Sequence, residues 1–171
     1  MRLADLTALE AGAAGGEFLR CCGSSRWARQ MAAARPFADA GAMTLVADVL
    51  WSALQPSDWL EAFAAHPRIG QTASGRSGAS AWSDQEQARV ADAAEQTRRR
   101  LADANRDYEA RFGYLFIVCA TGRTAEEMLA LLEGRLRHDA DEELRIAAEE
   151  QRRITRLRLR KLLEQEPDTI S

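Results

Sequence analysis

The feature that most constrains the fold is a long row of residues at helical spacing in the middle of the chain. Within residues 84–112, positions three and four apart recur along one side, and these are Glu86, Val90, Ala94, Thr97, Leu101, Ala104, Tyr108 and Phe112. A repeat of 3.6 residues places all of them on one face of an α-helix. The pattern therefore predicts one helix over 84–112, ended by Gly113, with this face turned toward a core.

The composition predicts that the rest of the chain is helical too. Alanine, leucine, arginine and glutamate dominate, whereas valine, isoleucine and threonine are sparse, so helix propensity is high over most windows. With 171 residues, the chain is long enough for one buried core and too short for two ordinary domains. We expect an all-α fold, a single-domain helical bundle of about seven or eight helices over residues 1–171. Capping and stop signals place the helices at about 7–21, 25–34, 41–54, 56–65, 84–112, 124–136, and from Asp139 or Asp141 to 165.

Two stretches do not read as helices. The glycine-rich sequence "GQTASGRSGAS" at 70–80 predicts a loop. The apolar run "YLFIVCAT" at 114–121 fits either a buried extended segment or one buried turn. Periodicity does not decide between these two structures.

Charge and targeting signals exclude several classes of protein. The 26 acidic residues outnumber the 23 basic ones and interleave with them, giving a net charge of −3, which argues against a nucleic-acid-binding surface. No apolar run approaches 18 residues, the N-terminus lacks the order of a signal peptide, and the C-terminal "DTIS" is not a peroxisomal address. We therefore expect a cytoplasmic protein that binds neither membranes nor nucleic acid.

The sequence also lacks the residues of most cofactor chemistries. Its single lysine, Lys161, lies in a charged C-terminal stretch, which makes a Schiff base or pyridoxal-phosphate site improbable. The cysteines, two of them adjacent, have neither disulfide-framework nor metal-site spacing and are expected to be reduced, buried thiols. There is no metal-binding histidine motif, nucleophile elbow or phosphate loop. An enzyme built on this chain would work with side chains alone, without cofactor or metal.

His66, one of only two histidines, directly precedes Pro67 at the expected end of a helix. One interpretation is a capping cation, which the helix dipole stabilises by about 0.3 to 1 kcal/mol. The other is a proton donor poised near neutral pH, since the same helix end favours imidazolium.

Glu86 and Arg158 also allow two interpretations each. Ser83 and Glu86 fit a capping box at the start of the long helix, yet Glu86 also lies on its inward row. Arg158 and Gln151 lie within the apolar row of the last helix. A buried arginine needs an anion, which is either a glutamate of a neighbouring helix or a bound ligand.

Several motifs together carry a family resemblance. They are "RPF" at 35–37, "HPRIG" at 66–70, "WSDQEQA" at 82–88, "YEARFGYLFIVCATGRTAEEML" at 108–129 and "ELRIAAEEQRRITRLRLRKLL" at 143–163. In this order and spacing the chain resembles the 2-oxo-4-hydroxy-4-carboxy-5-ureidoimidazoline (OHCU) decarboxylases of urate degradation. Each motif is weak alone, but the combination is specific and covers nearly the whole length.

The resemblance implies an all-helical, cofactor-free enzyme, usually a homodimer, that converts OHCU into (S)-allantoin. It implies that His66 and Glu86 are the catalytic, proton-handling pair and that Arg158 binds the substrate. The other positions it assigns to the substrate pocket are Pro67, Ser83, Gln87, Ile117, Val118, Cys119, Ala120 and Thr121. Two alternatives stay open, a helical interaction module without activity and a relative acting on a different ring carboxylate.

Overall fold

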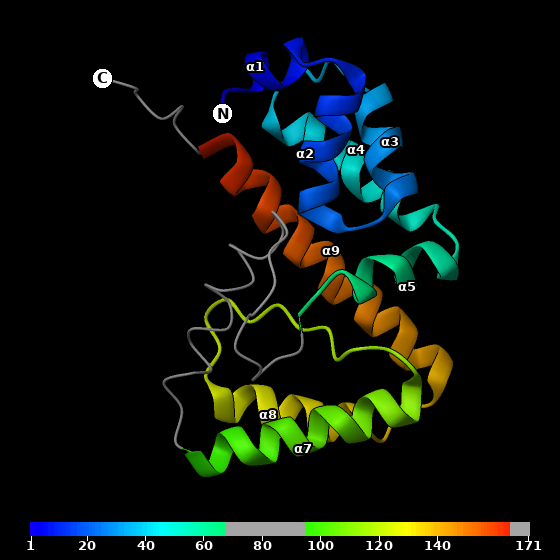
Figure 1. Ribbon diagram of the computed structural model, residues 1–171, viewed down its shortest axis with the longest axis vertical. Helices are drawn as coiled ribbons and strands as arrows, with labels where there is room; N and C mark the ends of the chain where they lie inside the picture. Colours follow the sequence, from blue (N-terminus) through cyan, green and yellow to red (C-terminus); the bar gives the residue numbers. More distant parts are fainter. Residues whose placement is uncertain (68–94, 165–171) are drawn as a thin grey trace. The chain divides into compact units, whose positions relative to one another are not determined.

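The computed structural model describes residues 1–67 and 95–164, and all regular secondary structure in these two ranges is α-helical. Within these described ranges eight helices follow one another (Figure 1), namely α1 (Leu3–Ala8), α2 (Ala11–Cys22), α3 (Ser25–Ala33), α4 (Ala40–Ser52), α5 (Pro56–Ala64), α7 (Glu95–Phe112), α8 (Ala125–Arg135) and α9 (Ala140–Glu164). The prediction of an all-α fold is confirmed. The glycine-rich stretch 70–80 and the beginning of the helix expected over 84–112 lie outside the described residues.

The first expected helix, 7–21, is wrong at its beginning, because two helices occupy this region. Leu9 and Glu10 have extended backbone, with ψ of 145° and 150°, and separate α1 from α2. The carbonyl oxygens of Leu6 and Leu9 at this break accept hydrogen bonds from Arg35 Nη1, at 2.7 and 2.8 Å. An arginine from a distant part of the chain thus satisfies carbonyls that a continuous helix would have bonded internally.

The other helix ends follow the predicted signals. α2 ends at Gly23, whose φ of 82° lies in the left-handed region that favours glycine. α7 ends before Gly113 at φ 81°. α8 begins with the expected capping box, in which the Glu127 N–H donates to Thr124 Oγ1 at 3.1 Å and the Thr124 N–H donates to the Glu127 carboxylate at 2.8 Å. Asp139 accepts from the Glu142 N–H at 2.8 Å and starts α9.

Contacts divide the chain into two compact units, Met1–Ala62 with Arg152–Ser171, and Phe63–Gln151. The first unit has a core in which Phe18 and Trp27 meet edge to face, with ring centroids 6.1 Å apart. Trp27 Nε1 donates to the Ala47 carbonyl at 3.0 Å and so joins α3 to α4. The interpretation of residues 1–171 as one domain stays a prediction.

The second unit contains α7 and α8, which pack side by side (Figure 1), and the first part of α9. Its apolar core comprises Leu101, Ala104, Tyr108, Phe116, Val118, Ala120, Ala125, Met128, Leu129 and Leu132. The described part of the row that predicted the long helix is thus largely buried, with Leu101 and Tyr108 at 1% and 0% exposure.

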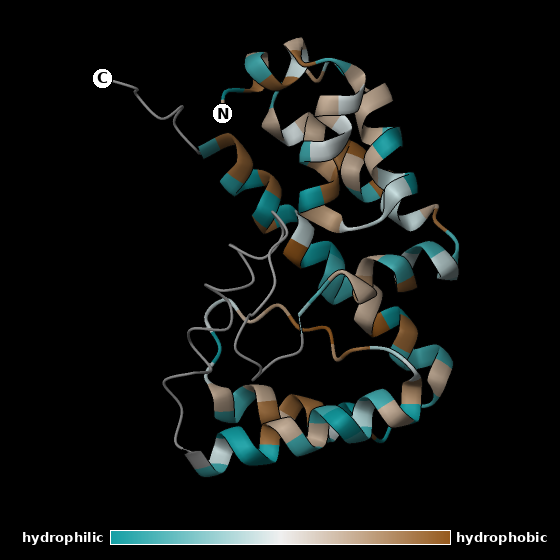
Figure 2. Ribbon diagram, in the orientation of Figure 1, coloured by the Kyte–Doolittle hydropathy of each residue, from teal (hydrophilic) through white to brown (hydrophobic). Residues whose placement is uncertain are grey.

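The apolar run between α7 and α8 is not helical from residue 115 to residue 120. Phe116, Ile117 and Val118 are buried, and the connection between the two helices is hydrophobic over much of its length (Figure 2). The alternative of one buried helical turn is therefore excluded. A buried extended segment leaves backbone groups that need partners from elsewhere.

Candidate active site

His66 lies directly after α5, close to the predicted end of this helix. Its backbone N–H donates to the Phe63 carbonyl at 3.1 Å, and Pro67 follows. The ring of Phe63 packs against that of Tyr114, with centroids 5.4 Å apart. The backbone of His66 is therefore tied to the apolar core of the second unit, and the residue is half-buried.

The imidazole of His66 contacts Gln151 of α9. Its Nε2 lies 2.6 Å from Gln151 Oε1, and the glutamine has no exposed surface. Sequence analysis placed Gln151 on the inward row of the last helix but did not assign it to the site. The sequence feature that could have indicated a role for Gln151 is its neutral polar side chain within an apolar row, because such a side chain needs a buried hydrogen-bond partner. No pattern in the sequence identified that partner as a histidine 85 residues away.

The preceding residue of α9 holds the extended segment. The Cys119 backbone N–H donates to the carboxylate of Glu150 at 2.7 Å, and Glu150 is only 8% exposed. Hydrogen bonds to an ionised acceptor are stronger than neutral ones, by roughly a factor of two. Two consecutive residues of α9 thus hold two of the predicted site elements, the His66 ring and the backbone of segment 117–121.

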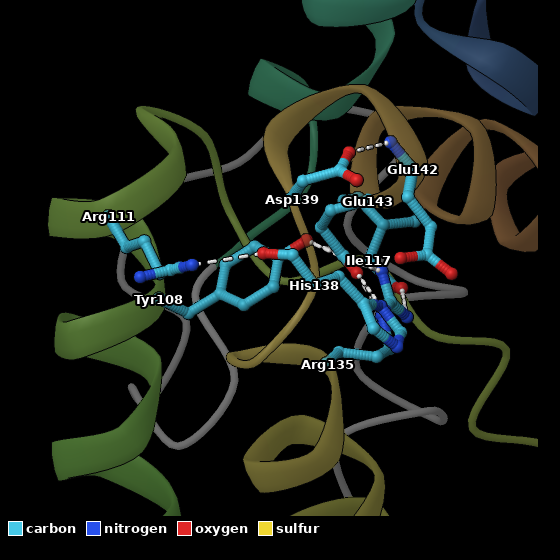
Figure 3. Close-up of polar contacts among 8 residues, drawn as sticks. All are labelled: Tyr108, Arg111, Ile117, Arg135, His138, Asp139, Glu142 and Glu143. Carbon is cyan, nitrogen blue, oxygen red and sulfur yellow. Dashed lines mark hydrogen bonds and ion pairs between the residues drawn. The ribbon is translucent and has the colours of Figure 1, made fainter.

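Arg135, at the end of α8, holds the same segment from a second direction (Figure 3). Its Nη1 donates to the Ile117 carbonyl at 2.7 Å and its Nε donates to the Glu143 carboxylate at 2.7 Å. The guanidinium also lies over the Phe116 ring, 4.6 Å from the centroid. Arg135 is 6% exposed, so these contacts form away from water, where charge pairing is least screened.

Glu143 is the centre of a polar cluster that consists of the buried Tyr108, Arg135 and Glu143 and the half-buried His138 (Figure 3). Besides Arg135, its carboxylate accepts from the Tyr108 hydroxyl and from His138 Nδ1, the latter at 2.9 Å. Burial raises the pKa of the Tyr108 phenol, an effect that the charge of Arg135 opposes and the hydrogen bond to Glu143 supports. The phenol therefore stays protonated and keeps donating to the carboxylate.

Arg158 is buried in the first unit, at 3% exposure, as its position in the apolar row predicted. Its Nη1 donates to the Cys21 carbonyl at 3.5 Å. Burial raises the pKa of the Cys21 thiol to about 12, although the charge of Arg158 acts in the opposite direction.

The remaining predicted positions differ in their placement. Ile117, Val118 and Ala120 are buried, Pro67 and Cys119 are half-buried, and Thr121 is exposed. Ser83, Glu86 and Gln87 lie outside the described residues, so their role in the site stays a prediction.

Across residues 1–67 and 95–164, no three His, Cys, Asp or Glu side chains gather as they would around a metal ion. The same ranges contain no helix long and apolar enough to cross a membrane. None of the three cysteines, all of which the structure describes, forms a disulfide. Cys21 and Cys22 are buried as expected, whereas Cys119 is only half-buried, contrary to the expectation of three buried thiols.

Residues 7–160 match the family model described as OHCU decarboxylase. The chain belongs to the OHCU decarboxylase family. The match extends over both units and includes His66, Glu86 and Arg158.

Two curated relatives support the membership. This OHCU decarboxylase family member is 40% identical over 158 residues to the uric acid degradation bifunctional protein TTL of Arabidopsis thaliana. It is 35% identical over 65 residues to the 2-oxo-4-hydroxy-4-carboxy-5-ureidoimidazoline decarboxylase of Amia calva. The alignments cover 91% and 38% of this chain, but only 49% and 37% of those relatives.

Two solved structures share the fold. A crystal structure of OHCU decarboxylase in the presence of (S)-allantoin superposes with a TM-score of 0.77 at 38% identity, covering 88% of this chain and 99% of that one. A structure of (S)-allantoin synthase superposes with a TM-score of 0.70 at 18% identity, covering 95% of this chain and 54% of that one. The second likeness concerns the fold alone.

Proposed function

We propose that this protein is a cofactor-independent carboxy-lyase that converts OHCU into (S)-allantoin in urate degradation. The observation that carries the proposal is the 38% identity to an OHCU decarboxylase, solved in the presence of (S)-allantoin, over 99% of that chain. The motifs that resemble the family lie within the matched residues 7–160, except for the last three residues of the motif at 143–163. The hydrogen bond between His66 and the buried Gln151 of α9 also supports the proposal, because it holds the imidazole in place.

The substrate can supply its own electron sink. In OHCU the ring carbon that carries the carboxylate and the hydroxyl lies next to a C=N bond. When the bond to the carboxylate breaks, its electron pair becomes a C=C bond between these two carbons, and the C=N electrons move onto nitrogen. That nitrogen and the carbon bearing the ureido group each then take up a proton, and loss of the hydroxyl proton gives the carbonyl of allantoin. No cofactor is needed to accept the electrons.

The protein therefore has three tasks, which are to orient the carboxylate, to manage the hydroxyl proton, and to direct protonation to one face of the ring. We assign proton handling to His66 and Glu86. We assign substrate binding to Arg158, whose guanidinium offers a rigid two-donor fork, and to the pocket positions Pro67, Ser83, Gln87 and 117–121. The buried contacts of Arg135 and Glu150 support this assignment, because they fix the 117–121 backbone before substrate arrives.

The assembly and location belong to the same proposal. We expect a homodimer, as the family resemblance implies, and a cytoplasmic location. Sedimentation of the purified protein tests the dimer, and a sedimentation coefficient of a monomer at micromolar concentration would contradict it.

A coupled assay tests the activity. Freshly generated OHCU is added to purified protein, and its ultraviolet absorbance is followed against the uncatalysed decay. The sample is first dialysed exhaustively against a chelator, and we expect turnover to be unchanged. Turnover that is lost on dialysis and restored by a divalent metal would contradict the cofactor-free mechanism, and decay at the uncatalysed rate would contradict the function itself.

A further inference from the structure

The contact between His66 and Gln151 restricts which imidazole nitrogen can take part in proton transfer. Nε2 lies 2.6 Å from an amide oxygen. A carboxamide oxygen only accepts hydrogen bonds, so the contact requires a proton on Nε2. In the neutral ring, one nitrogen carries the proton and the other carries the lone pair. A proton fixed on Nε2 leaves the lone pair on Nδ1.

The surroundings of Gln151 favour this orientation of its amide. Gln151 has no exposed surface, so water does not compete for the oxygen. An imidazolium has two N–H donors and no acceptor. An amide oxygen therefore stays bonded to Nε2 in both charge states of His66, whereas an amide NH2 group would be repelled by the charged ring. An amide oxygen can therefore orient an imidazole that gains and loses a proton, because it accepts from Nε2–H in the neutral and in the protonated ring.

α9 makes this partner rigid. Glu150, the preceding residue, is bonded to the Cys119 backbone N–H at 2.7 Å, and both contacts lie within the second unit. A helix fixes the backbone of both residues, and the segment bonded to Glu150 is held in turn by Arg135 at the Ile117 carbonyl. The ring of His66 is thus oriented by a scaffold rather than by a loop.

We propose that Gln151 is the positioning residue of His66, holding Nε2–H so that Nδ1 is the nitrogen that exchanges a proton during the reaction. The proposal rests on the proposed decarboxylase function, in which His66 handles protons. It also makes a claim about the free protein, that the neutral ring is the Nε2–H tautomer. That claim can be tested without substrate.

The first test is nuclear magnetic resonance of protein labelled with 15N-histidine. Long-range 1H–15N correlation spectra distinguish the two tautomers, and we would record them at about pH 8.5, roughly two units above the usual imidazole pKa. The chain has only two histidines, so a spectrum of His66→Asn identifies the His138 signals. We expect the Nε2–H tautomer for His66 in the unsubstituted protein. The Nδ1–H tautomer would overturn the proposal.

The second test uses three variants. Gln151→Met keeps the approximate size but removes the acceptor, and we expect mixed His66 tautomers and a fall in kcat of about 100-fold with a smaller change in KM. Gln151→Glu keeps an acceptor oxygen and should retain the Nε2–H tautomer. The control is Thr155→Val, which removes a buried polar atom about one turn further along α9. It should lower the melting temperature without changing the His66 spectrum.

The outcomes separate this proposal from the proposed function. If Gln151→Met retains both the tautomer and kcat, Gln151 is only a packing residue and the proposal is overturned. If the unsubstituted protein does not convert OHCU, the function fails, yet the tautomer spectra still decide whether Gln151 orients His66.

Discussion

Arg135→Met should strongly destabilise the protein, because it leaves a buried carboxylate without its cation. Glu143 has no exposed surface, and its carboxylate lies 2.7 Å from Arg135 Nε. Removing one partner of a buried ion pair typically costs about 3–5 kcal/mol. A domain of this kind has a free energy of unfolding of about 5–15 kcal/mol, so the loss is a large fraction of it. The bond to the Ile117 carbonyl disappears as well.

The double variant Arg135→Met/Glu143→Leu gives the decisive comparison. It removes both charges, and replacing a whole buried ion pair by apolar side chains is often close to neutral. Part of this gain is lost because the Tyr108 hydroxyl then lacks its acceptor, at about 1–3 kcal/mol. We therefore expect the double variant to be more stable than Arg135→Met alone, an unmistakable departure from additivity.

Urea unfolding followed by far-ultraviolet circular dichroism measures these free energies. Arg100→Met is the matched control, since Arg100 of α7 pairs with Glu133 of α8 at a similar distance, 2.7 Å, but with side chains 59% and 44% exposed. Such a surface pair contributes at most about 1 kcal/mol. The reasoning is refuted if Arg135→Met costs no more than Arg100→Met, or if the double variant is as unstable as the single one.

Three further predictions concern the catalytic pair, the substrate arginine and the buried thiols. His66→Asn and Glu86→Gln should each lower kcat by about 100-fold or more, while the melting temperature stays close to that of the unsubstituted protein. If Glu86 also caps its helix, Glu86→Gln should in addition lower the free energy of unfolding by about 1 kcal/mol. Arg158→Lys and Arg158→Gln should both weaken substrate use, chiefly by raising KM, because a lysine lacks the planar two-donor fork. Burial raises the pKa of Cys21 and Cys22 from 9.0 to about 12, so their contribution to stability is complete below pH 9 and is lost as the pH rises toward 12. In urea unfolding the free energy should fall by roughly 1 kcal/mol per thiol per pH unit above pH 9, and Cys21→Ala/Cys22→Ala should flatten this dependence.

Each of these predictions has an outcome that contradicts it. If the His66 and Glu86 variants are folded and have the turnover of the unsubstituted protein, the interpretation of both residues as helix caps is favoured over a catalytic role. Arg158 variants that melt early but keep the KM of the unsubstituted protein would identify a structural ion pair. A pH dependence above pH 9 that the double cysteine variant leaves unchanged would show that these thiols do not cause it.

Much of the fold could be predicted because helix boundaries depend on local chemistry. Thr124 with Glu127 marked the start of α8, and Gly113 and Gly23 marked helix ends, since each signal acts within a few residues of its own position. The break at Leu9 and Glu10 escaped prediction for the opposite reason. Its carbonyls are bonded by Arg35, which reaches them from about 26 residues further along the chain.

The candidate site likewise contains residues that local sequence features could predict and residues that only the tertiary structure reveals. His66 and Arg158 were conspicuous because a helix-terminal imidazole and an arginine in an apolar row are locally unusual. Gln151 also lay in that row, but only the tertiary structure reveals its contact with His66. Likewise, the letters of "YLFIVCAT" do not indicate which residues bind its backbone, because those residues lie elsewhere in the sequence. Arg135 and Glu150 supply that support from α8 and α9.

The handedness of the product is the most direct test of the central claim. Decarboxylation in water leaves a planar carbon that is protonated equally from both faces, so the uncatalysed reaction gives racemic allantoin without a circular dichroism signal. We predict that this protein, given freshly generated OHCU, produces a circular dichroism signal of (S)-allantoin that grows as the substrate absorbance falls, and that His66→Asn abolishes the excess rate. Racemic product formed at the uncatalysed rate would contradict the account.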